Sequence, residues 1–393
     1  MSKVLLGDVA EERRETCKGN KDGYPTVGLE HLTPEEITLT SWDEGSDNTF
    51  TKMFRKGDVL FGRRRAYLKK AAVAPFDGIC SGDITVIETK PNYLLPELLP
   101  FIIQNDALFS FAVEKSAGSL SPRVKWEHLK SYEFELPNMD KQRELAELLW
   151  AMDDTKKSYQ QLIAATDELV KSQFIEITQS GDRTPTRMGD IATYVNGYAF
   201  KPQDWSFEGV PIIRIQNLND PSADFNRFAG EIDEKYLVHN GDVLVSWATH
   251  LEAYLWNGGD AWLNQHIFKV VFDKRKVNKV FFNFAANYAL KEAFKKAHGF
   301  KATMEHIKRG DFEDAIVMMP DLFQQEEFAT LVRQSDKSKF AVLNCLKRNL
   351  LLILQKTEDV HSLINQSAKS ISVKAVTGRI IMDRERYLIL ING

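Results

Sequence analysis

The sequence is poor in cysteine and lacks long apolar runs. Its 393 residues include only three cysteines, Cys17, Cys80 and Cys345, and these form no CxxC pair. This pattern predicts a reducing compartment and no structural zinc. No apolar run approaches the ~18 residues of a membrane span. The N-terminus carries Lys3 and Asp8 too early for a signal peptide. We therefore expect a cytoplasmic protein with no membrane partner.

Strong net charge is also absent. The formal charge is −4 and the sequence pI is about 6.1. Domains that coat nucleic acid non-specifically usually have a pI above ~9, so this class is disfavoured, whereas binding through a local basic patch is not. A hydrophobic fraction of 43% and a charged fraction of 27% are typical of a globular protein. The length predicts two to three domains of about 150 residues each.

Catalytic motifs are missing as well. The sequence has no GxxxxGK[ST] phosphate loop, no GxGxxG after a strand, no Asn-Pro-Pro-aromatic stretch, no HExxH and no Cys/His cluster. The acids Asp321, Glu326 and Glu327 fall at the start of a predicted helix, where they complement the helix dipole. We therefore expect no catalytic residue, no metal ligand and no cofactor in this chain.

What the sequence does contain is a tandem repeat. LGDVA at 6–10 recurs as MGDIA at 188–192, and KGDVL at 56–60 recurs as NGDVL at 240–244. Three weaker matches keep the same order: 24–32 with 210–218, 127–130 with 305–308, and 136–137 with 319–320. Shared order and spacing favour a duplicated module of about 183 residues over a coincidence of common turns.

Each half combines a mixed globular region with a long helix. Runs such as 59–61, 84–87 and 243–245 are β-branched or aromatic and are bounded by Gly and Asp, which is typical of strands. Pro137 and Pro320 each precede a long stretch without Pro or Gly, at 141–177 and 324–363. The predicted fold class is α+β, with two tandem α/β domains each followed by a long helix.

The two long helices share a heptad-like apolar seam. Shifting the first seam by about 183 residues places it on the second, and the polar positions Lys156 and Lys339 coincide. Buried lysines can fix helix register, although the same residues could snorkel at the edge of the seam. We predict that the helices pair as an antiparallel coiled coil with pseudo-two-fold symmetry. The expected pairing residues are Leu149, Lys156, Tyr159, Ile163, Thr166, Val170, Val332, Lys339, Val342, Leu346, Asn349 and Ile353.

Two segments of the first half are basic. Residues 52–70 hold eight Lys or Arg against the single acid Asp58, and an Arg triplet at 63–65 follows a predicted strand. Residues 119–125 form a hydroxyl-rich loop with Arg123 and Lys125. Arg can grip phosphate or read guanine, and Ser with cations is a composition that suits phosphate contacts. A solvated hairpin and an ordinary loop remain alternatives.

The second half differs where the first is basic. The sequence SWATH at 246–250 replaces the Arg triplet, 264–266 (Asn-Gln-His) replaces 81–83, and Arg214, Gln216 and Asn217 are expected in the strand equivalent to 27–31. Asn and Gln suit contacts to adenine. A common framework with divergent polar loops favours two modules that read different targets, with drift after duplication as the alternative.

The chain resembles the specificity subunits of type I restriction-modification systems. The resemblance covers about 365 residues and includes residues 57–61, 197–201 and 210–214 and the two Pro-to-helix junctions at 136–143 and 319–326. It implies that each globular region is a target recognition domain for one half of a bipartite, asymmetric DNA site. The helices would set the spacer and dock two methyltransferase subunits, and restriction/translocase subunits would complete the complex. S-adenosylmethionine, ATP and Mg would belong to those partners.

On this basis we expect double-stranded DNA to contact both halves. In the first half the candidate contacts are Arg63, Arg64, Arg65, Tyr67, Lys69, Lys70, Ser119, Ser121, Arg123 and Lys125. In the second half they are Tyr198, Lys201, Arg214, Gln216, Asn217, Thr249, His250, Tyr254, Asn264, Gln265, His266, Lys301 and Thr303.

The expected organisation comprises recognition domains at 1–137 and 182–320, long helices at 138–181 and 321–366, and a tail at 367–393 that the repeat does not explain. Two other functions remain open. One is the specificity subunit of a related system in which one polypeptide both cuts and methylates. The other is a coiled-coil scaffold whose globular ends bind proteins.

Overall fold

The structure is a computed structural model that describes residues 2–45, 49–90, 92–181, 183–220, 223–272, 277–298 and 307–356. The described residues fall into two compact units. One contains the chain up to Tyr159 together with the part of the last helix from Cys345, and the other contains Gln160 to Asn344. The tail at 367–393 lies outside the described residues.

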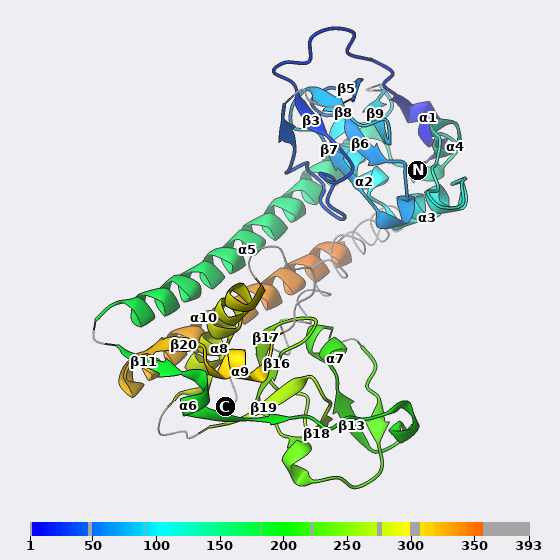
Figure 1. Cartoon of the computed structure of the whole chain (residues 1–393). Helices are drawn as coiled ribbons and strands as arrows, with labels where there is room; N and C mark the ends of the chain where they lie inside the picture. The colour runs from blue at the N-terminus through cyan, green and yellow to red at the C-terminus, as the bar shows by residue number, and fades with distance from the viewer. Residues whose placement is uncertain are drawn as a thin grey trace. The chain divides into compact units, whose positions relative to one another are not determined.

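The first half holds short strands and helices followed by one long helix (Figure 1). Its elements are β1 (Ser2–Leu5), α1 (Leu6–Val9), β2 (Ala10–Glu12), β3 (Pro25–Val27), β4 (Asp43–Glu44), β5 (Lys52–Phe54), β6 (Val59–Gly62), η1 (Ala66–Leu68), β7 (Ala71–Val73), β8 (Gly78–Cys80), β9 (Ile84–Thr89), η2 (Pro96–Leu98), α2 (Leu99–Ile103), α3 (Asp106–Glu114), α4 (Trp126–Leu129), β10 (Glu133–Leu136) and α5 (Met139–Gln179).

The second half follows the same plan. Its elements are β11 (Thr184–Arg187), α6 (Met188–Ile191), β12 (Ala192–Asn196), η3 (Pro202–Asp204), β13 (Val210–Ile213), α7 (Ile215–Asn219), β14 (Arg227–Phe228), η4 (Glu234–Tyr236), β15 (Leu237–Val238), β16 (Val243–Ser246), β17 (Glu252–Leu255), β18 (Ala261–Leu263), β19 (Ile267–Phe272), α8 (Lys279–His298), α9 (Arg309–Glu313), β20 (Ile316–Met319) and α10 (Leu322–Lys356).

Sheet topology repeats between the two halves. The antiparallel sheet β2-β9-β6-β7 corresponds to β12-β19-β16-β17, and the mixed sheet β4-β3-β8-β5 corresponds to β14-β13-β18-β15. Each mixed sheet contains one parallel pair, β3 with β8 and β13 with β18. Each domain is closed by a two-stranded ribbon, β1 with β10 and β11 with β20. The predicted fold class and tandem repeat are therefore confirmed.

In each domain a hydrophobic core joins the two four-stranded sheets. Phe54 and Cys80 of one sheet and Leu60 and Val86 of the other belong to one buried cluster in the first domain. Ile213 and Leu263 share a cluster with Leu244 in the second domain. Burying apolar side chains contributes about 25 cal/mol per Å² removed from water, so this core holds the loops at the strand ends in place.

The repeated sequence phrases coincide with close backbone contacts. A Cβ on Gly7 would lie 2.9 Å from the Cβ of Lys130, and a Cβ on Gly189 would lie 3.2 Å from the Cβ of Glu313. In the GD turns, the carboxylate of Asp58 accepts the N–H of Arg55 at 2.7 Å, and that of Asp242 accepts the N–H of His239 at 3.0 Å. The same residue types therefore perform the same structural task in both halves.

A buried glutamine ties each long helix to its own domain. Gln142 Oε1 accepts the N–H of Leu95 at 2.8 Å, and its Nε2 donates to Pro137 O at 2.9 Å. Gln325 Oε1 accepts the N–H of Asn278 at 2.8 Å, and its Nε2 donates to Pro320 O at 2.9 Å. Both side chains are 1% exposed, so both ends of each amide are used where water is excluded.

The long helices contact each other within the second unit. The rings of Phe174 and Phe328 lie 5.8 Å apart, and Lys339 of α10 pairs with Asp167 of α5. Residue numbers fall along one helix as they rise along the other, so these segments run antiparallel. In the first unit the hydroxyl of Tyr159 lies 3.5 Å from the sulfur of Cys345. Pairing along the full length stays a prediction.

Burial along the helices follows part of the expected seam. The buried residues of the seam are Leu149, Lys156, Val170, Val332, Lys339 and Leu346. The half-buried ones are Tyr159, Ile163, Thr166 and Val342. The side chains of Asn349 and Ile353 lie outside the described part. Lys156 Nζ donates to Glu35 O at 3.2 Å and lies 3.6 Å from Glu36 Oε1, so it connects α5 to its own domain.

Candidate nucleic-acid interface

Three loops of the first domain meet beyond the end of β6. The N–H of Arg63 donates to Asp83 O at 3.0 Å, and the N–H of Val124 donates to Arg63 O at 3.0 Å. The N–H of Arg65 donates to Pro122 O at 2.8 Å. The structure therefore brings together the Arg triplet and the hydroxyl-rich loop, which the sequence placed about 60 residues apart.

Asp83 lies between two arginines of this cluster. Arg123 donates to it from Nε at 2.7 Å and from Nη2 at 3.3 Å, and Arg64 Nη1 lies 3.4 Å from Oδ2. Arg64 Nε also donates to Ser121 Oγ at 2.5 Å. Hydrogen bonding from Arg123 lowers the pKa of Asp83 and raises the pKa of Arg123 itself. Both ions of this pair are therefore favoured at neutral pH.

Not all cations of residues 52–70 are available to a ligand in the folded domain. Acids from elsewhere in the chain pair with several of its cations, as Asp106 does with Lys69 and Glu12 does with Lys52. Lys70 Nζ donates to Leu29 O at 2.6 Å. Counting charges along the sequence misses these partners, so the candidate patch shrinks to the loop cluster. Four other candidate residues, beside this cluster or within its loops, are exposed: Arg65, Tyr67, Ser119 and Lys125.

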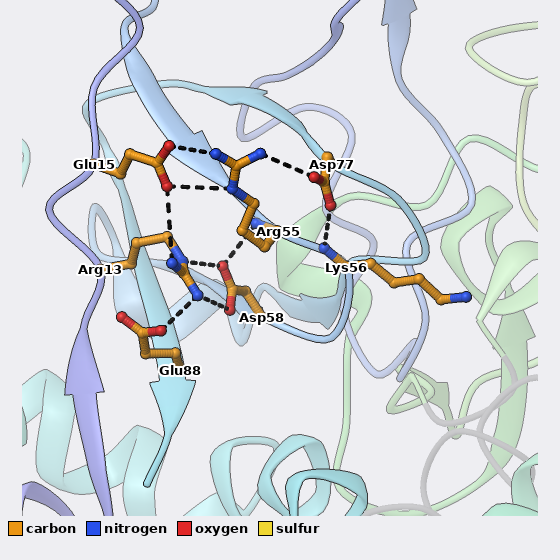
Figure 2. A network of polar contacts seen from close by, with 7 residues as sticks. All are labelled: Arg13, Glu15, Arg55, Lys56, Asp58, Asp77 and Glu88. Atoms are coloured by element: carbon orange, nitrogen blue, oxygen red, sulfur yellow. Dashed lines mark hydrogen bonds and ion pairs between the residues drawn. The ribbon is translucent and has the colours of Figure 1, made fainter. Parts of the chain in front are cut away.

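Figure 2 shows a second charged network in this domain. Arg55 pairs with Glu15 and with Asp77 at 2.9 Å, while Arg13 pairs with Asp58 at 2.6 Å and with Glu88 at 2.5 Å. Asp58 is buried and also accepts the N–H of Arg55, so the network closes the turn before β6. These cations stabilise the domain, and their guanidinium groups are occupied by carboxylates.

The second domain has the same backbone framework with different side chains. The N–H of Trp247 donates to His266 O at 3.3 Å, and the N–H of Ile307 donates to Trp247 O at 3.2 Å. They correspond to two bonds of the first domain, from the N–H of Arg63 to Asp83 O and from the N–H of Val124 to Arg63 O. The N–H of Gln265 donates to Tyr198 O at 2.9 Å, and Tyr198 forms a β-bridge with Asn264. Here an aromatic and amide cluster replaces the arginines.

Left-handed backbone conformations occur at the same loop position in both halves. Arg65 has φ of 54° and Thr249, its counterpart, has φ of 65°. Lys69 and His266 also have positive φ, at 51° and 74°. Such conformations are unfavourable for residues other than glycine, above all for β-branched Thr, and they concentrate at functional loops. Sequence reasoning selected all four residues but not their conformation.

The strand expected to hold Arg214, Gln216 and Asn217 ends earlier. β13 stops at Ile213, and the next residues form the short helix α7 because Asn217 Oδ1 accepts the N–H of Arg214 at 3.1 Å. Asn217 is buried and its amide donates to Ala223 O at 3.1 Å, which is a structural role. Gln216 is exposed.

Other candidates of the second domain divide into bonded and exposed groups. The hydroxyl of buried Tyr254 donates to Asn219 Oδ1 at 2.6 Å, which directs it into the domain. The guanidinium of Arg214 lies 5.5 Å from the ring of Trp205. Lys201, Thr249 and His250 are exposed. Lys301 and Thr303 lie outside the described residues.

Sequence reasoning missed three residues that shape these clusters. Asp83 was noted only for its position, yet it joins Arg64 to Arg123. Trp247 packs on His266 with ring centroids 4.8 Å apart, and Trp205 covers Arg214. A lone acid or tryptophan carries no periodic signal, so only the fold reveals these partners.

Neither a metal site nor a membrane helix is found in the part of the chain that the structure describes. Among those residues, no three or more His, Cys, Asp or Glu side chains gather where they could hold a metal ion. None of the described helices has the length and apolar character needed to cross a lipid bilayer.

Comparison with known proteins gives concordant matches. The family model described as "Type I restriction modification DNA specificity domain" matches residues 2–165 and 182–352. The EcoBI specificity subunit of Escherichia coli is 26% identical over 207 residues, which is 51% of this chain and 40% of that protein. The match thus spans about two fifths of the length of this curated relative.

Two solved structures share the fold. One, titled as the type I R-M system S subunit from M. genitalium, is 12% identical, has a TM-score of 0.56, and is matched over 94% of this chain and 96% of its own. The other comes from work on complex assembly and conformational transition of the type I R-M system. It is 17% identical with a TM-score of 0.53, over 95% of this chain and 97% of its own.

Proposed function

Because this chain belongs to the family of type I restriction-modification DNA specificity proteins, we propose that it is the DNA sequence-specificity subunit of such a complex. Each recognition domain reads one half of a bipartite, asymmetric site on double-stranded DNA. The two long helices set the spacer between the halves and dock two methyltransferase subunits. Two modules on one face of DNA contact sites about one helical turn, roughly 34–36 Å, apart.

The chemistry belongs to the partners in this proposal. The methyltransferase subunits bind S-adenosylmethionine and flip the target base out of the helix. The restriction/translocase subunits use ATP and Mg. The chain itself is non-catalytic, holds no cofactor and works in the cytoplasm. The proposed domain limits remain 1–137 and 182–320, with the helices at 138–181 and 321–366.

The observation that carries the proposal is the repeated loop framework. Arg63 and Trp247 occupy equivalent positions and make equivalent backbone hydrogen bonds, to Asp83 and His266 respectively. A constant backbone with changed side chains is what two readers of different sequences need, since base edges are distinguished by the donors and acceptors presented to them. Divergent loops would also suit a scaffold with two different protein partners, and it is the match to the DNA specificity domain family that favours DNA as the ligand.

Methylation mapping tests the proposal. The chain is purified with its methyltransferase partner, and methylated adenines are mapped on genomic DNA lacking modification. A bipartite motif with a fixed spacer is expected, and a pattern without one would refute the proposal. Identifying the proteins that copurify shows whether one partner polypeptide carries both the cleavage and the methylation activity or two partners carry them separately.

Charge reversal separates DNA reading from the scaffold function. The triple change of Arg63, Arg64 and Arg65 to Glu is expected to weaken DNA binding by the complex and to reduce the salt dependence of its affinity. A matched triple reversal of Lys291, Lys295 and Lys296, on α8, controls for net charge. Equal effects of both triples would contradict a specific role for the Arg cluster.

A further inference from the structure

Resting on the proposed function, we propose that Arg123 reads a guanine in the half-site of the first domain and that Asp83 is the positioning residue that orients its guanidinium. One edge of the Arg123 guanidinium is bonded to Asp83, and hydrogen bonds fix the backbones of both residues. The proposed contact assigns a base type to one residue of the first domain, which the family match does not.

Asp83 engages only one side of the Arg123 guanidinium. The bonds from Nε at 2.7 Å and from Nη2 at 3.3 Å form a two-point contact with the carboxylate. A guanidinium carries five N–H groups in a fixed plane. The end of the group, with one hydrogen on each Nη atom, therefore has no partner among the described residues. That end presents two parallel donors, which match the O6 and N7 acceptors of guanine in the major groove.

The contrast with Arg13 shows why this arrangement is suited to a ligand. Arg13 makes the same two-point contact with Asp58, but its Nη2 also pairs with Glu88 at 2.5 Å and its Nη1 lies 3.8 Å from Glu15. Acids thus surround Arg13, whose side chain is 22% exposed, whereas the side chain of Arg123 is 44% exposed with one acid. Arg13 is saturated within the fold and Arg123 is not.

Both members of the pair are fixed through their backbones. Arg123 exchanges two hydrogen bonds with Ala117, at 2.9 and 3.0 Å. The N–H of Asp83 donates to Ser81 Oγ at 3.2 Å, and its carbonyl accepts the N–H of Arg63. A side chain positioned before binding loses less conformational entropy when it meets its target, which favours specific contacts.

Arg64 is less suited to the same task. Its Nε is bonded to Ser121 and its Nη1 lies 3.4 Å from the same carboxylate, so its contacts are divided between two partners. His266 takes the place of Asp83 in the second domain and provides no carboxylate there. The proposed guanine contact is therefore specific to the half-site of the first domain, and the other half-site becomes an internal control.

The test compares Arg123→Lys, Arg123→Gln and Asp83→Asn in the complex with its methyltransferase partner. Methylation is measured on a DNA library in which every position of the wild-type motif is randomised. For Arg123→Gln we expect one guanine of one half-site to lose about 5- to 150-fold of its preference over other bases, and for Arg123→Lys a smaller loss at the same position. Asp83→Asn should relax the same position, and the other half-site should stay unchanged.

The pattern of the loss distinguishes base reading from phosphate contact, because loss of a phosphate contact weakens binding to all sequences alike whereas loss of a guanine contact relaxes one position. Lys keeps the charge and can donate to guanine but lacks the rigid planar pair of donors, so Arg123→Lys should relax that position less than Arg123→Gln. Arg13→Gln serves as the control for a structural arginine and should lower stability without relaxing any base. Thermal melting of each complex verifies folding.

The possible failures are separable. If the wild-type complex methylates no bipartite motif, the proposed function is wrong. If it does, but no guanine position relaxes in Arg123→Gln, or all positions weaken equally, the inference about Arg123 is overturned while the proposed function stands.

Discussion

Replacing Gln142 by Ala is expected to destabilise the first unit by about 3 kcal/mol. The side chain is 1% exposed and satisfies the N–H of Leu95 and the carbonyl of Pro137. A buried donor or acceptor left without a partner costs about 1–3 kcal/mol. Gln142→Ala leaves two such groups without a partner, the N–H of Leu95 and the carbonyl of Pro137. Gln142 Nε2 makes a third, longer bond, to Tyr93 O at 3.2 Å.

Two further variants separate the contributions. Gln142→Glu keeps an acceptor for the N–H of Leu95 but places a buried carboxylate oxygen against the carbonyl of Pro137, so at neutral pH the loss should be at least as large as in Gln142→Ala. Gln325→Ala removes the equivalent bonds to Asn278 and Pro320 in the second unit, where a similar loss is expected. If the two glutamines have the same role, Gln142→Ala should lower the stability of the first unit and Gln325→Ala that of the second.

Urea unfolding combined with residue-resolved hydrogen exchange measures both effects. Gln142→Ala should accelerate exchange of the Leu95 amide by about 100-fold, since 1.4 kcal/mol corresponds to about a factor of ten. The amide of Asn278 should be affected only by Gln325→Ala. A change below about 0.5 kcal/mol, with the Leu95 amide still protected, would refute the reasoning.

Two further predictions concern titratable groups. Burial raises the pKa of the Cys80 thiol to about 12, so alkylation of the native protein at pH 8 should modify exposed Cys345 and spare Cys80, as peptide mapping by mass spectrometry would show. Arg123 lowers the pKa of Asp83 below its ordinary 3.8, so their ion pair stabilises the loops above that value and is lost as pH falls through the lowered pKa. An NMR titration of the Asp83 carboxyl with a midpoint at or above 3.8 would contradict this.

The repeat was predictable because it rests on short-range chemistry. The Gly-Asp turns and the glycines at close contacts demand particular residue types, so Asp58 and Asp242 stay recognisable in the sequence. Hydrophobic periodicity likewise located the long helices. In these cases a local rule and the global fold agree.

The charged surface could not be predicted in the same way. Lys69 finds Asp106 and Arg123 finds Asp83, partners that lie 37 and 40 residues away along the chain. Sequence proximity says nothing about such pairs. The strand expected at Arg214 failed for a local reason, because the side chain of Asn217 bonds back to the N–H of Arg214 and starts a short helix.

The hydrogen bonds that join Arg63 to Asp83 and Trp247 to His266 involve only main-chain atoms. Their donors and acceptors are present whatever side chain each residue carries, so these bonds remain available when a side chain at the loop surface changes. The cost of a new recognition surface is then confined to a few exposed positions instead of the whole domain. Such a scaffold can accumulate surface changes one at a time while each intermediate still folds, which makes a change of target accessible by small steps.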